Sequence, residues 1–269
     1  MLTTDRIDEF EHHLRLSGRS KQTAERYSRS MRAFNIWAGA VSDRALAKAL
    51  ARWILDGRDS GLGAGTIGCR VAVARAYLTF AGVDLGPLKD YRRPPVPSVR
   101  PHPLPGGIED ARKLIAGTDG PVRNAIALCS LAGLRINEAI TIDALEVDCG
   151  AVNWSLTVKG KGDKVREVPV SAELRDIIEK MPRVGRLAPL SHSHARQSIT
   201  DAARALGIRG DRPSGAVASH DLRATFATEI HKRTKDIVLV QRLLGHASVV
   251  TTQRYIGVEQ SSFRSAVEF

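Results

Sequence analysis

The sequence contains only three cysteines, Cys69, Cys129 and Cys149, and they lie far apart. Their odd number and wide spacing predict neither a disulfide framework nor a zinc site, and they favour a reducing, cytoplasmic environment. No apolar run approaches the length of about 18 residues that suggests a membrane-spanning helix. The first residues, MLTTDRIDEFEHH, do not have the pattern of a signal peptide, and the chain shows no internal repeat. A disulfide-rich secreted domain, a membrane protein and a repeat protein are therefore not expected.

Positive charge is what the chain has in excess. Its 269 residues include 40 lysines and arginines but only 29 aspartates and glutamates, which gives a net charge of +11. A hydrophobic share of 43% with 26% charged residues is typical of a folded, soluble protein. The charge favours a polyanionic partner, nucleic acid before membrane, and the alternative is a protein that is merely basic. Arginine outnumbers lysine, and its fork can bind two phosphate oxygens at once.

A proline-rich stretch divides the chain. Residues 92–107, RRPPVPSVRPHPLPGG, contain six of the 12 prolines. Proline removes a backbone donor and disfavours helix in the residue before it, so the stretch predicts a stiff, basic, extended linker. The alternative is a long loop inside one domain. We therefore expect a domain at 1–91, a linker at 92–105 and a second domain at 106–269.

The domain at 1–91 has the apolar spacing of a helical bundle. Apolar residues between Tyr27 and Trp37 recur at intervals of three and four, which places them on one face of a helix. Ser42 is expected to cap the next helix, and a third helix is expected to start at Thr66 and stop at Gly82. The expected fold of this part is all-helical.

Several basic side chains of this bundle and of the linker are candidates for contacts with nucleic-acid phosphates. Those in the bundle are expected on helix faces away from the apolar stripes, and the alternative is an ordinary solvated surface. The candidates are Lys21, Arg26, Arg29, Arg32, Arg70, Arg92, Arg93 and Arg100.

The apolar period changes after the linker. Helical patterns at 107–117 and 121–133 are followed by two stretches of strand composition, VNWSLTV and VREVPV, joined by the glycine-punctuated turn KGKGDK. With LEVD ahead of them, these stretches predict a three-stranded antiparallel sheet, and helical patterns return from residue 171 onwards. The expected fold class is mainly α, with an all-helical N-terminal bundle and a mixed α/β C-terminal domain that carries one small sheet.

Four short strings carry side chains that can do chemistry: AGLRINEA, GKG, SHDLRATFAT and GHASVVTTQRY. Taken singly, each has an ordinary explanation. Arg135 and Glu138 fit an ion pair on a helix, Lys161 fits a solvated lysine in a hairpin turn, and Ser219 fits a helix cap. The last string places a histidine past one helix end and a tyrosine on the helix that follows.

Together, these side chains form the set that a metal-free phosphoryl transfer needs. Two arginines can hold the nonbridging oxygens of a phosphodiester and offset charge in the transition state. A lysine can protonate the leaving alkoxide, and histidines can donate to the phosphate or exchange a proton with the nucleophile. A tyrosine can attack phosphorus. Nearby cations would favour its phenolate, since an isolated phenol has a pKa of about 10.

With these residues in this order, the sequence resembles the tyrosine recombinases, the family of the phage integrases and of the Cre and Xer recombinases. The matching strings are GLRINEA, VKGKGDKVREVPV, HDLRATFAT and LLGHASVVTTQRY, which lie within 106–258. The string KQTAERYSRSMRAFNIWA and the linker match the family more weakly. Ala224 stands where many members of the family have a second histidine, at a position whose role varies.

The resemblance implies a role for each motif residue. Two arginines would clamp the scissile phosphate, a lysine would be the general acid for the 5′-oxygen, one histidine would assist proton transfer, and the other would donate to the phosphate. The tyrosine would be the nucleophile, and an acidic residue would support the first arginine. Arg135 and Arg223 would be the clamping arginines, and Lys161 would be the general acid. His220 would assist proton transfer, and His246 would donate to the phosphate. Tyr255 would be the nucleophile, and Glu138 would support Arg135. Lys159 and Lys164 are rivals of Lys161.

The resemblance also implies a site-specific recombinase that cleaves and rejoins double-stranded DNA through a 3′-phosphotyrosine, without a cofactor, a metal ion or ATP. Four protomers on two DNA sites would act through a Holliday junction in the cytoplasm of a bacterium, encoded by it or by a phage, and an accessory factor could set the direction. The chain starts with the helical bundle, so we expect a compact form without an arm-binding domain. The tail at 257–269 is expected to dock Phe263 and Val267 on a neighbouring protomer, and a disordered end is the alternative.

Two alternatives stand beside this interpretation. A catalytically silent DNA-binding or architectural protein could share the fold, although no residue of the motif set is missing. A metal-dependent nuclease could use the string SHSH at 191–194. No carboxylate cluster accompanies that string, and solvated residues at a helix start account for it better.

Overall fold

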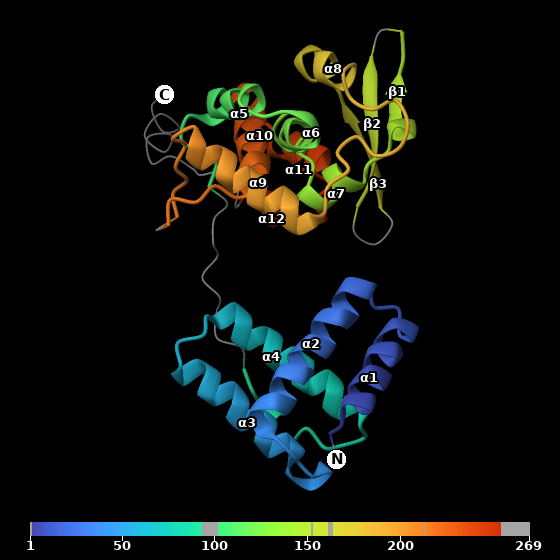
Figure 1. Ribbon diagram of the computed structural model, residues 1–269, viewed down its shortest axis with the longest axis vertical. Coiled ribbons are helices and arrows are strands. Elements are labelled where there is room, and N and C mark those ends of the chain that lie inside the picture. The colour runs from blue at the N-terminus through green and yellow to red at the C-terminus, as the bar shows by residue number, and fades with distance from the viewer. Residues whose placement is uncertain (1, 93–101, 152, 161–163, 213, 254–269) are drawn as a thin grey trace, which may run out of the picture. The chain divides into compact units, whose positions relative to one another are not determined.

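The chain divides into two compact units, residues 1–97 and 98–269, in the computed structural model (Figure 1). No described helix is long and apolar enough to cross a membrane. The predicted domain boundaries flank a linker that is mostly outside the described residues, so they stay a prediction. The residues that the structure describes are 2–92, 102–151, 153–160, 164–212 and 214–253.

The described part of the first unit consists of helices that pack around aromatic side chains. Phe10 meets Tyr77 edge to face with ring centroids 5.1 Å apart, and Phe34 meets Trp53 in the same manner at 5.5 Å. All four rings are buried, and the prediction of an all-helical bundle is confirmed. The elements are α1 (Thr4–Leu16), α2 (Lys21–Ala38), α3 (Asp43–Asp59), α4 (Ala64–Phe80) and the short 3₁₀ helix η1 (Gly86–Leu88).

The helix ends of this unit differ in detail from the sequence prediction. Ser42 occupies the cap position of α3, but its side chain makes no capping hydrogen bond. The fourth helix begins at Ala64 rather than at Thr66, and Gly63 takes the cap position. Gly82 follows the helix end as predicted, with a φ of 66° that favours glycine.

Arg75 binds the backbone of residues 88–91, just before the linker. Arg75 on α4 donates hydrogen bonds to the carbonyl oxygens of Leu88, Lys89 and Tyr91 at distances of 2.7 to 3.2 Å. Backbone carbonyls outside helices and sheets need such partners when they lose water. The contact fixes the backbone just before the linker.

Two central helices, α6 (Gly120–Leu131) and α10 (Ser219–Thr234), organise the second unit. They pack against each other, and their buried stretches are residues 124–130 of α6 and 221–227 of α10. Most residues of these stretches are apolar or small, as burial requires, and Asp221 and Arg223 are the charged exceptions. The described helices around them are α5 (Gly107–Ala116), α7 (Ile136–Thr141), α8 (Ala172–Ile178), α9 (His192–Ala205), α11 (Ile237–Leu244) and α12 (Val249–Gln253).

One antiparallel sheet stands at the edge of the second unit, with the strand order β1-β2-β3 (Figure 1). Leu156, Val158 and Val168 alternate with outward residues and belong to the core of the unit. The predicted three-stranded sheet is confirmed. The first strand begins at the third residue of the string LEVD, because the first two residues belong to the 3₁₀ helix η2. The bounds are η2 (Ala144–Glu146), β1 (Val147–Cys149), β2 (Trp154–Lys159) and β3 (Val165–Pro169).

Candidate active site

The string AGLRINEA forms a tight turn into α7, with Arg135 at the cap position of the helix. Gly133 permits the turn, because its φ is 66° and a side chain there would come within 2.4 Å of the Phe226 ring. Arg135 binds Glu138 twice: its backbone N–H donates to Oε2 at 2.8 Å, and its Nη1 donates to Oε1 at 2.7 Å. The ion pair suggested by the sequence is present, and 36% of the Arg135 side chain still reaches solvent.

The Glu138 carboxylate is buried among arginines. Both of its oxygens accept hydrogen bonds from Arg166, and Oε2 lies 3.7 Å from Nη1 of Arg223. Burial acts to raise the pKa of Glu138, but the hydrogen bonds from Arg166 and Arg135 outweigh it and lower the pKa to about 2. The carboxylate therefore stays ionised and holds the guanidinium groups beside it.

Arg223 is fully buried on α10. Its Nη1 donates to the carbonyl oxygen of Gly133 at 2.5 Å, and its Nη2 donates to the carbonyl oxygen of Leu244 at 2.7 Å. The same Nη2 lies 3.0 Å from Nε2 of His246. One side chain thus joins the turn before α7 to the turn after α11.

His246 is buried, and its contacts define its tautomer. Arginine can only donate, so the Nε2 atom that faces Arg223 accepts. Nδ1 therefore carries the proton and donates to Oγ1 of the buried Thr252 at 2.9 Å. Burial, followed by the charges of Arg223 and Arg135, lowers the pKa of His246 to about 4. The ring is neutral at neutral pH.

His220 lies in the first turn of α10, one turn before Arg223. His220 keeps part of its surface exposed, yet partial desolvation by the surrounding protein, followed by the charge of Arg223, lowers its pKa. The expected cap at Ser219 is wrong by one residue, because Ser219 is the first helical residue and Ala218 takes the cap position. The helix start is held instead by Asp221, which accepts from the Ala218 N–H at 2.8 Å.

Four of the motif residues form one contact network, which we call the motif cluster: Arg135, Glu138, Arg223 and His246. His220 lies close enough for the charges of Arg223 and Arg135 to lower its pKa. Lys161 and Tyr255 lie outside the described residues. Sequence reasoning finds the members of the cluster and the pairing of Arg135 with Glu138, but not the contacts of Arg223 and His246.

The two lysines that rival Lys161 have different surroundings. Lys159 ends β2, and its Nζ lies 3.0 Å from Oε1 of Glu146, so this ammonium is already engaged. Lys164 accepts a hydrogen bond through its carbonyl oxygen from the Gly160 N–H at 2.7 Å, which closes the base of the hairpin. That ion pair is exposed, so it does not by itself rank Lys159 below Lys164.

Of the basic residues proposed for phosphate contact, Arg70 is not on a solvated face. Its guanidinium stacks over the Trp53 ring at 3.9 Å from the centroid, and its Nη1 donates to the Trp53 carbonyl oxygen at 2.9 Å. Burial lowers the pKa of Arg70. The long side chain turns back over the apolar stripe, so the expected orientation is wrong.

The other basic candidates are on the surface where they are described. Arg32 pairs with Asp8 at 2.5 Å, and Lys21 lies 3.9 Å from Glu25. Such exposed pairs are weak and can be exchanged for a phosphate. The remaining exposed candidates are Arg26, Arg29 and Arg92, and Arg93 and Arg100 lie outside the described residues.

Sequence reasoning missed two residues that belong to this site. Thr252 accepts from His246, and Arg166 binds Glu138 with a complete fork. The alternation of the string VREVPV carried a signal for Arg166, because it shares the inward face of β3 with Val168. Thr252 had no such signal in the sequence.

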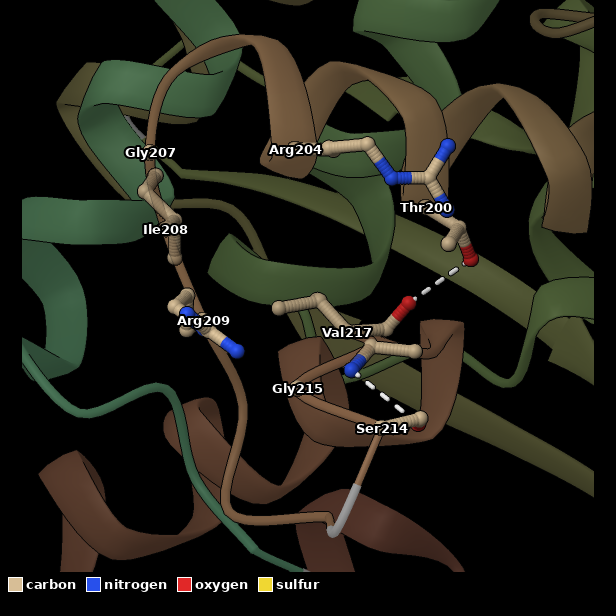
Figure 2. Close-up of a pocket in the computed structure, with 9 residues that line it drawn as sticks. Thr200, Arg204, Gly207, Ile208, Arg209, Ser214, Gly215 and Val217 are labelled. Carbon is tan, nitrogen blue, oxygen red and sulfur yellow. Dashed lines mark hydrogen bonds between the residues drawn. The ribbon is translucent and has the colours of Figure 1, made fainter.

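A cavity of about 300 Å³ lies between the end of α9 and the loop before α10, and no motif residue lines it. Figure 2 shows Arg204 and Arg209 at its rim and the hydrogen bond from Thr200 to the Val217 carbonyl oxygen. The nearby string SHSH starts α9, where the Ser191 side chain accepts from the His194 N–H. Among the described residues, no group of three or more histidine, cysteine, aspartate or glutamate side chains could hold a metal ion.

Comparison with known proteins gives the class of the chain. Residues 109–261 match the phage integrase family, which is more than half of the chain. The tyrosine recombinase XerA of Thermococcus onnurineus (strain NA1) is 30% identical over 284 residues, which span 97% of this chain and 94% of that protein. The tyrosine recombinase XerC of Methylobacterium sp. (strain 4-46) is 31% identical, with coverage of 93% and 87%.

A solved structure shares the fold. The XerH site-specific recombinase, bound to difH substrate in a pre-cleavage complex, gives a TM-score of 0.67 at 18% identity, covering 100% of this chain and 85% of that one. The chain therefore belongs to the phage integrase family, and it is a site-specific DNA recombinase of the tyrosine class.

Proposed function

We propose that the chain cleaves and rejoins double-stranded DNA through a covalent bond between Tyr255 and a 3′-phosphate. The observation that carries the proposal is the motif cluster. Its residues come from three separate strings, yet hydrogen bonds and ion pairs join them into one buried network. The names of the relatives, which are tyrosine recombinases, agree with this chemistry.

Arg135 and Arg223 are the groups that we assign to the scissile phosphate. Glu138 holds one side of Arg135, and the exposed part of the guanidinium can bind a nonbridging oxygen. The Arg223 Nη2 that now faces His246 would find a stronger acceptor in a phosphate oxygen. Two fixed cations at this position would offset the charge that develops at phosphorus.

The two histidines take different proton roles in this proposal. Once a phosphate replaces the imidazole as acceptor for Arg223, His246 can change tautomer: Nδ1 gives up its proton, Nε2 takes one, and the neutral ring donates from Nε2 to the phosphate. The Thr252 hydroxyl can then turn and donate to Nδ1, since a hydroxyl both donates and accepts. His220 has a lowered pKa, so its neutral ring can accept the proton of the Tyr255 phenol.

The bonds change in a balanced exchange. The Tyr255 oxygen attacks phosphorus, the bond to the 5′-oxygen breaks, and Lys161 supplies the proton that this oxygen needs. The phosphotyrosine conserves the phosphodiester energy, so a 5′-hydroxyl can reverse the step without ATP or a metal ion. Gly160, the residue before Lys161, lies close to the motif cluster, because a carbon added at Gly160 would come within 3.8 Å of Glu138 Oε1. This position supports the role proposed for Lys161.

The partner in this proposal is double-stranded DNA, contacted by both domains and by the basic linker. The solved complex of the XerH recombinase with its difH substrate supports that partner. Four protomers on two DNA sites would exchange strands through a Holliday junction, with the tail at 257–269 docked on a neighbour. An accessory factor would set the direction.

A nicked suicide substrate, which traps the covalent intermediate, tests the function. The natural chain should form a protein–DNA adduct, and Tyr255→Phe should form none while it retains DNA binding, because only one oxygen is lost. Excess EDTA should leave the adduct yield unchanged. An adduct with the phenylalanine variant would reveal another nucleophile. DNA binding with no adduct from the natural chain would identify a silent DNA-binding protein, and loss with EDTA that Mg²⁺ restores would identify a metal-dependent enzyme.

The general acid is tested with a 5′-bridging phosphorothioate, whose thiolate leaves without a proton. Lys161→Ala should slow cleavage of normal DNA by on the order of 10²- to 10⁴-fold and recover most of its rate on this substrate. Lys159→Ala is the matched control, since Lys159 is paired with Glu146. If Lys159→Ala or Lys164→Ala were rescued instead, that lysine would be the general acid. If none of the three variants were rescued, the proton donor would lie outside the hairpin.

A further inference from the structure

Arg166 has no role in the mechanism above, although it lies against the motif cluster. It stands on β3, on the same face as the core residue Val168, and only 11% of its side chain is exposed. A charge is costly to bury unless partners replace the lost water. The partners of Arg166 therefore show what the charge is used for.

The guanidinium of Arg166 contacts two other elements of the unit. Nη1 and Nη2 donate to Oε1 and Oε2 of Glu138 at 3.2 and 2.7 Å. Nε donates to the carbonyl oxygen of Leu243 at 3.1 Å. Glu138 belongs to α7, which follows Arg135, and Leu243 belongs to α11, which precedes His246. The Arg166 side chain on β3 thus binds both Glu138, which supports Arg135, and the end of α11.

The turn after α11 is shaped around the stem of Arg166. Gly245 has a φ of 63°, and a side-chain carbon there would come within 2.7 Å of Arg166 Cδ. Arg166 occupies the space that any other residue at 245 would fill. Because Gly245 is joined directly to His246, a displacement of Arg166 would also change the support of the histidine turn.

The lysine hairpin starts beside the same guanidinium. A carbon added at Gly160 would lie 3.7 Å from Arg166 Nη1 and 3.8 Å from Glu138 Oε1. The hairpin base is closed by the pair of Lys159 with Val165, the residue just before Arg166. Arg166 is therefore in contact with, or next in the chain to, the segments that lead to Arg135, to the lysine hairpin and to His246.

We propose that Arg166 is a positioning residue for strand cleavage. By binding Glu138 and the end of α11 from β3, it holds Arg135, the base of the lysine hairpin at Gly160 and the His246 turn in one arrangement. The inference rests on the proposed function, since it concerns the same site. The role needs a fork with several donors, which a lysine ammonium does not offer. An error of about 1 Å in such an arrangement can cost on the order of 10²-fold in rate.

The test measures single-turnover cleavage of the suicide substrate by full-length variants. Arg166→Ala should slow cleavage by on the order of 10²-fold and Arg166→Lys by about 10-fold. DNA affinity should stay within about threefold of the natural chain, because Arg166 acts through protein groups rather than through DNA contacts. A loss in rate with little loss in affinity is the signature of positioning.

Arg112→Ala is the matched control. Arg112 also binds a glutamate with two donors, to Glu173 at 2.9 and 2.8 Å, and both residues belong to the second unit. That pair is exposed and touches no motif residue. Its loss should leave cleavage within about twofold, because exposed ion pairs contribute little.

The dependence of the rate on pH separates positioning from a general loss of packing. The Arg166 charge helps to lower the pKa of Glu138 and of His246. The acidic limb of the rate profile should therefore shift to higher pH in Arg166→Ala and stay in place in Arg166→Lys. If thermal melting shows that the alanine variant is unfolded, the lysine variant decides.

The proposal is overturned if both Arg166 variants cleave as fast as Arg112→Ala, or if their affinity for DNA falls as much as their rate. In either case the proposed function stands, provided that the natural chain forms its covalent adduct. If the natural chain forms no adduct, the proposed function itself fails.

Discussion

Arg75 in the first unit and Arg223 in the second unit make similar contacts with different consequences. Arg75 donates to three backbone carbonyl oxygens and thereby fixes the segment before the linker. Arg223 also donates to two carbonyl oxygens, but its guanidinium reaches His246 and lies 3.7 Å from Glu138. Carbonyl partners only fix the backbone, whereas an imidazole and a carboxylate can change charge or exchange partners. The partners of an arginine, more than its burial, separate a structural role from a chemical one.

The largest expected effect comes from changing each arginine to lysine. Arg223→Lys should lower the rate of suicide-substrate cleavage by on the order of 10³-fold, because a point charge cannot bind the two turns and a phosphate together. Arg75→Lys should lower the free energy of unfolding by about 1 to 3 kcal/mol and leave cleavage per folded molecule unchanged. Rates measured well below each melting temperature make the comparison. A comparable rate loss in Arg75→Lys would remove the distinction between the two.

An intermediate effect is expected in the stability of the second unit against acid. The folded pKa of His246, about 4, lies below its ordinary value of 6.5. Between these values the unfolded chain binds more protons, so the contribution of neutral His246 is complete above pH 6.5 and is lost as the pH falls towards 4. The loss is roughly 3 kcal/mol.

Urea unfolding of the natural chain and of His246→Gln, at pH 7, 5.5, 4 and 3, checks this contribution. The glutamine variant should lose the decline between pH 6.5 and 4. It should keep the decline below pH 4.5 that comes from Glu138, whose pKa is lowered to about 2 and whose stabilisation is lost as the pH falls through that range. Equal declines in both proteins between pH 6.5 and 4 would contradict the buried, neutral state of His246.

The smallest expected effect distinguishes two arginines of the first unit. Arg29 is exposed on α2, whereas Arg70 stacks on Trp53. If Arg29 contacts a phosphate, Arg29→Ala should reduce the slope of log affinity against log salt by about 0.9. Arg70→Ala should leave the slope unchanged and lower the free energy of unfolding by roughly 1 to 2 kcal/mol, through the lost cation–π contact. Binding isotherms between 50 and 200 mM salt measure the slope, and thermal melts measure the stability. A smaller slope for Arg70→Ala would show that Arg70 contacts a phosphate after all.

The fold followed from periodicity, and the contacts of long side chains did not. The strand composition of VNWSLTV and VREVPV, with the glycine-punctuated turn between them, predicted β2 and β3. Helical spacing placed Arg70 away from the apolar stripe, but a long flexible stem let it return to Trp53. Periodicity gives the direction of Cβ and not the position of a guanidinium several bonds further out.

The candidate site shows the same limit. The strings supplied Arg135, Glu138, Arg223 and His246, and the structure joins them. Arg166 escaped because a charged residue in an alternating strand normally faces solvent, and its partner Glu138 lies 28 positions earlier in the chain. Long-range pairs of this kind require the fold itself.

The hydroxyl of Thr252 connects the packing of α12 with the hydrogen bonding of His246. It is buried on α12 and accepts the Nδ1 proton of His246, and α12 is the helix from which the chain continues towards Tyr255. Arg223 fixes Nε2 of His246 as an acceptor, and Thr252 completes the arrangement by accepting the proton that Nδ1 must then carry. The packing of α12 and the hydrogen bonding of His246 are therefore coupled, because the hydroxyl that receives the Nδ1 proton is in place only while this short helix lies against the histidine.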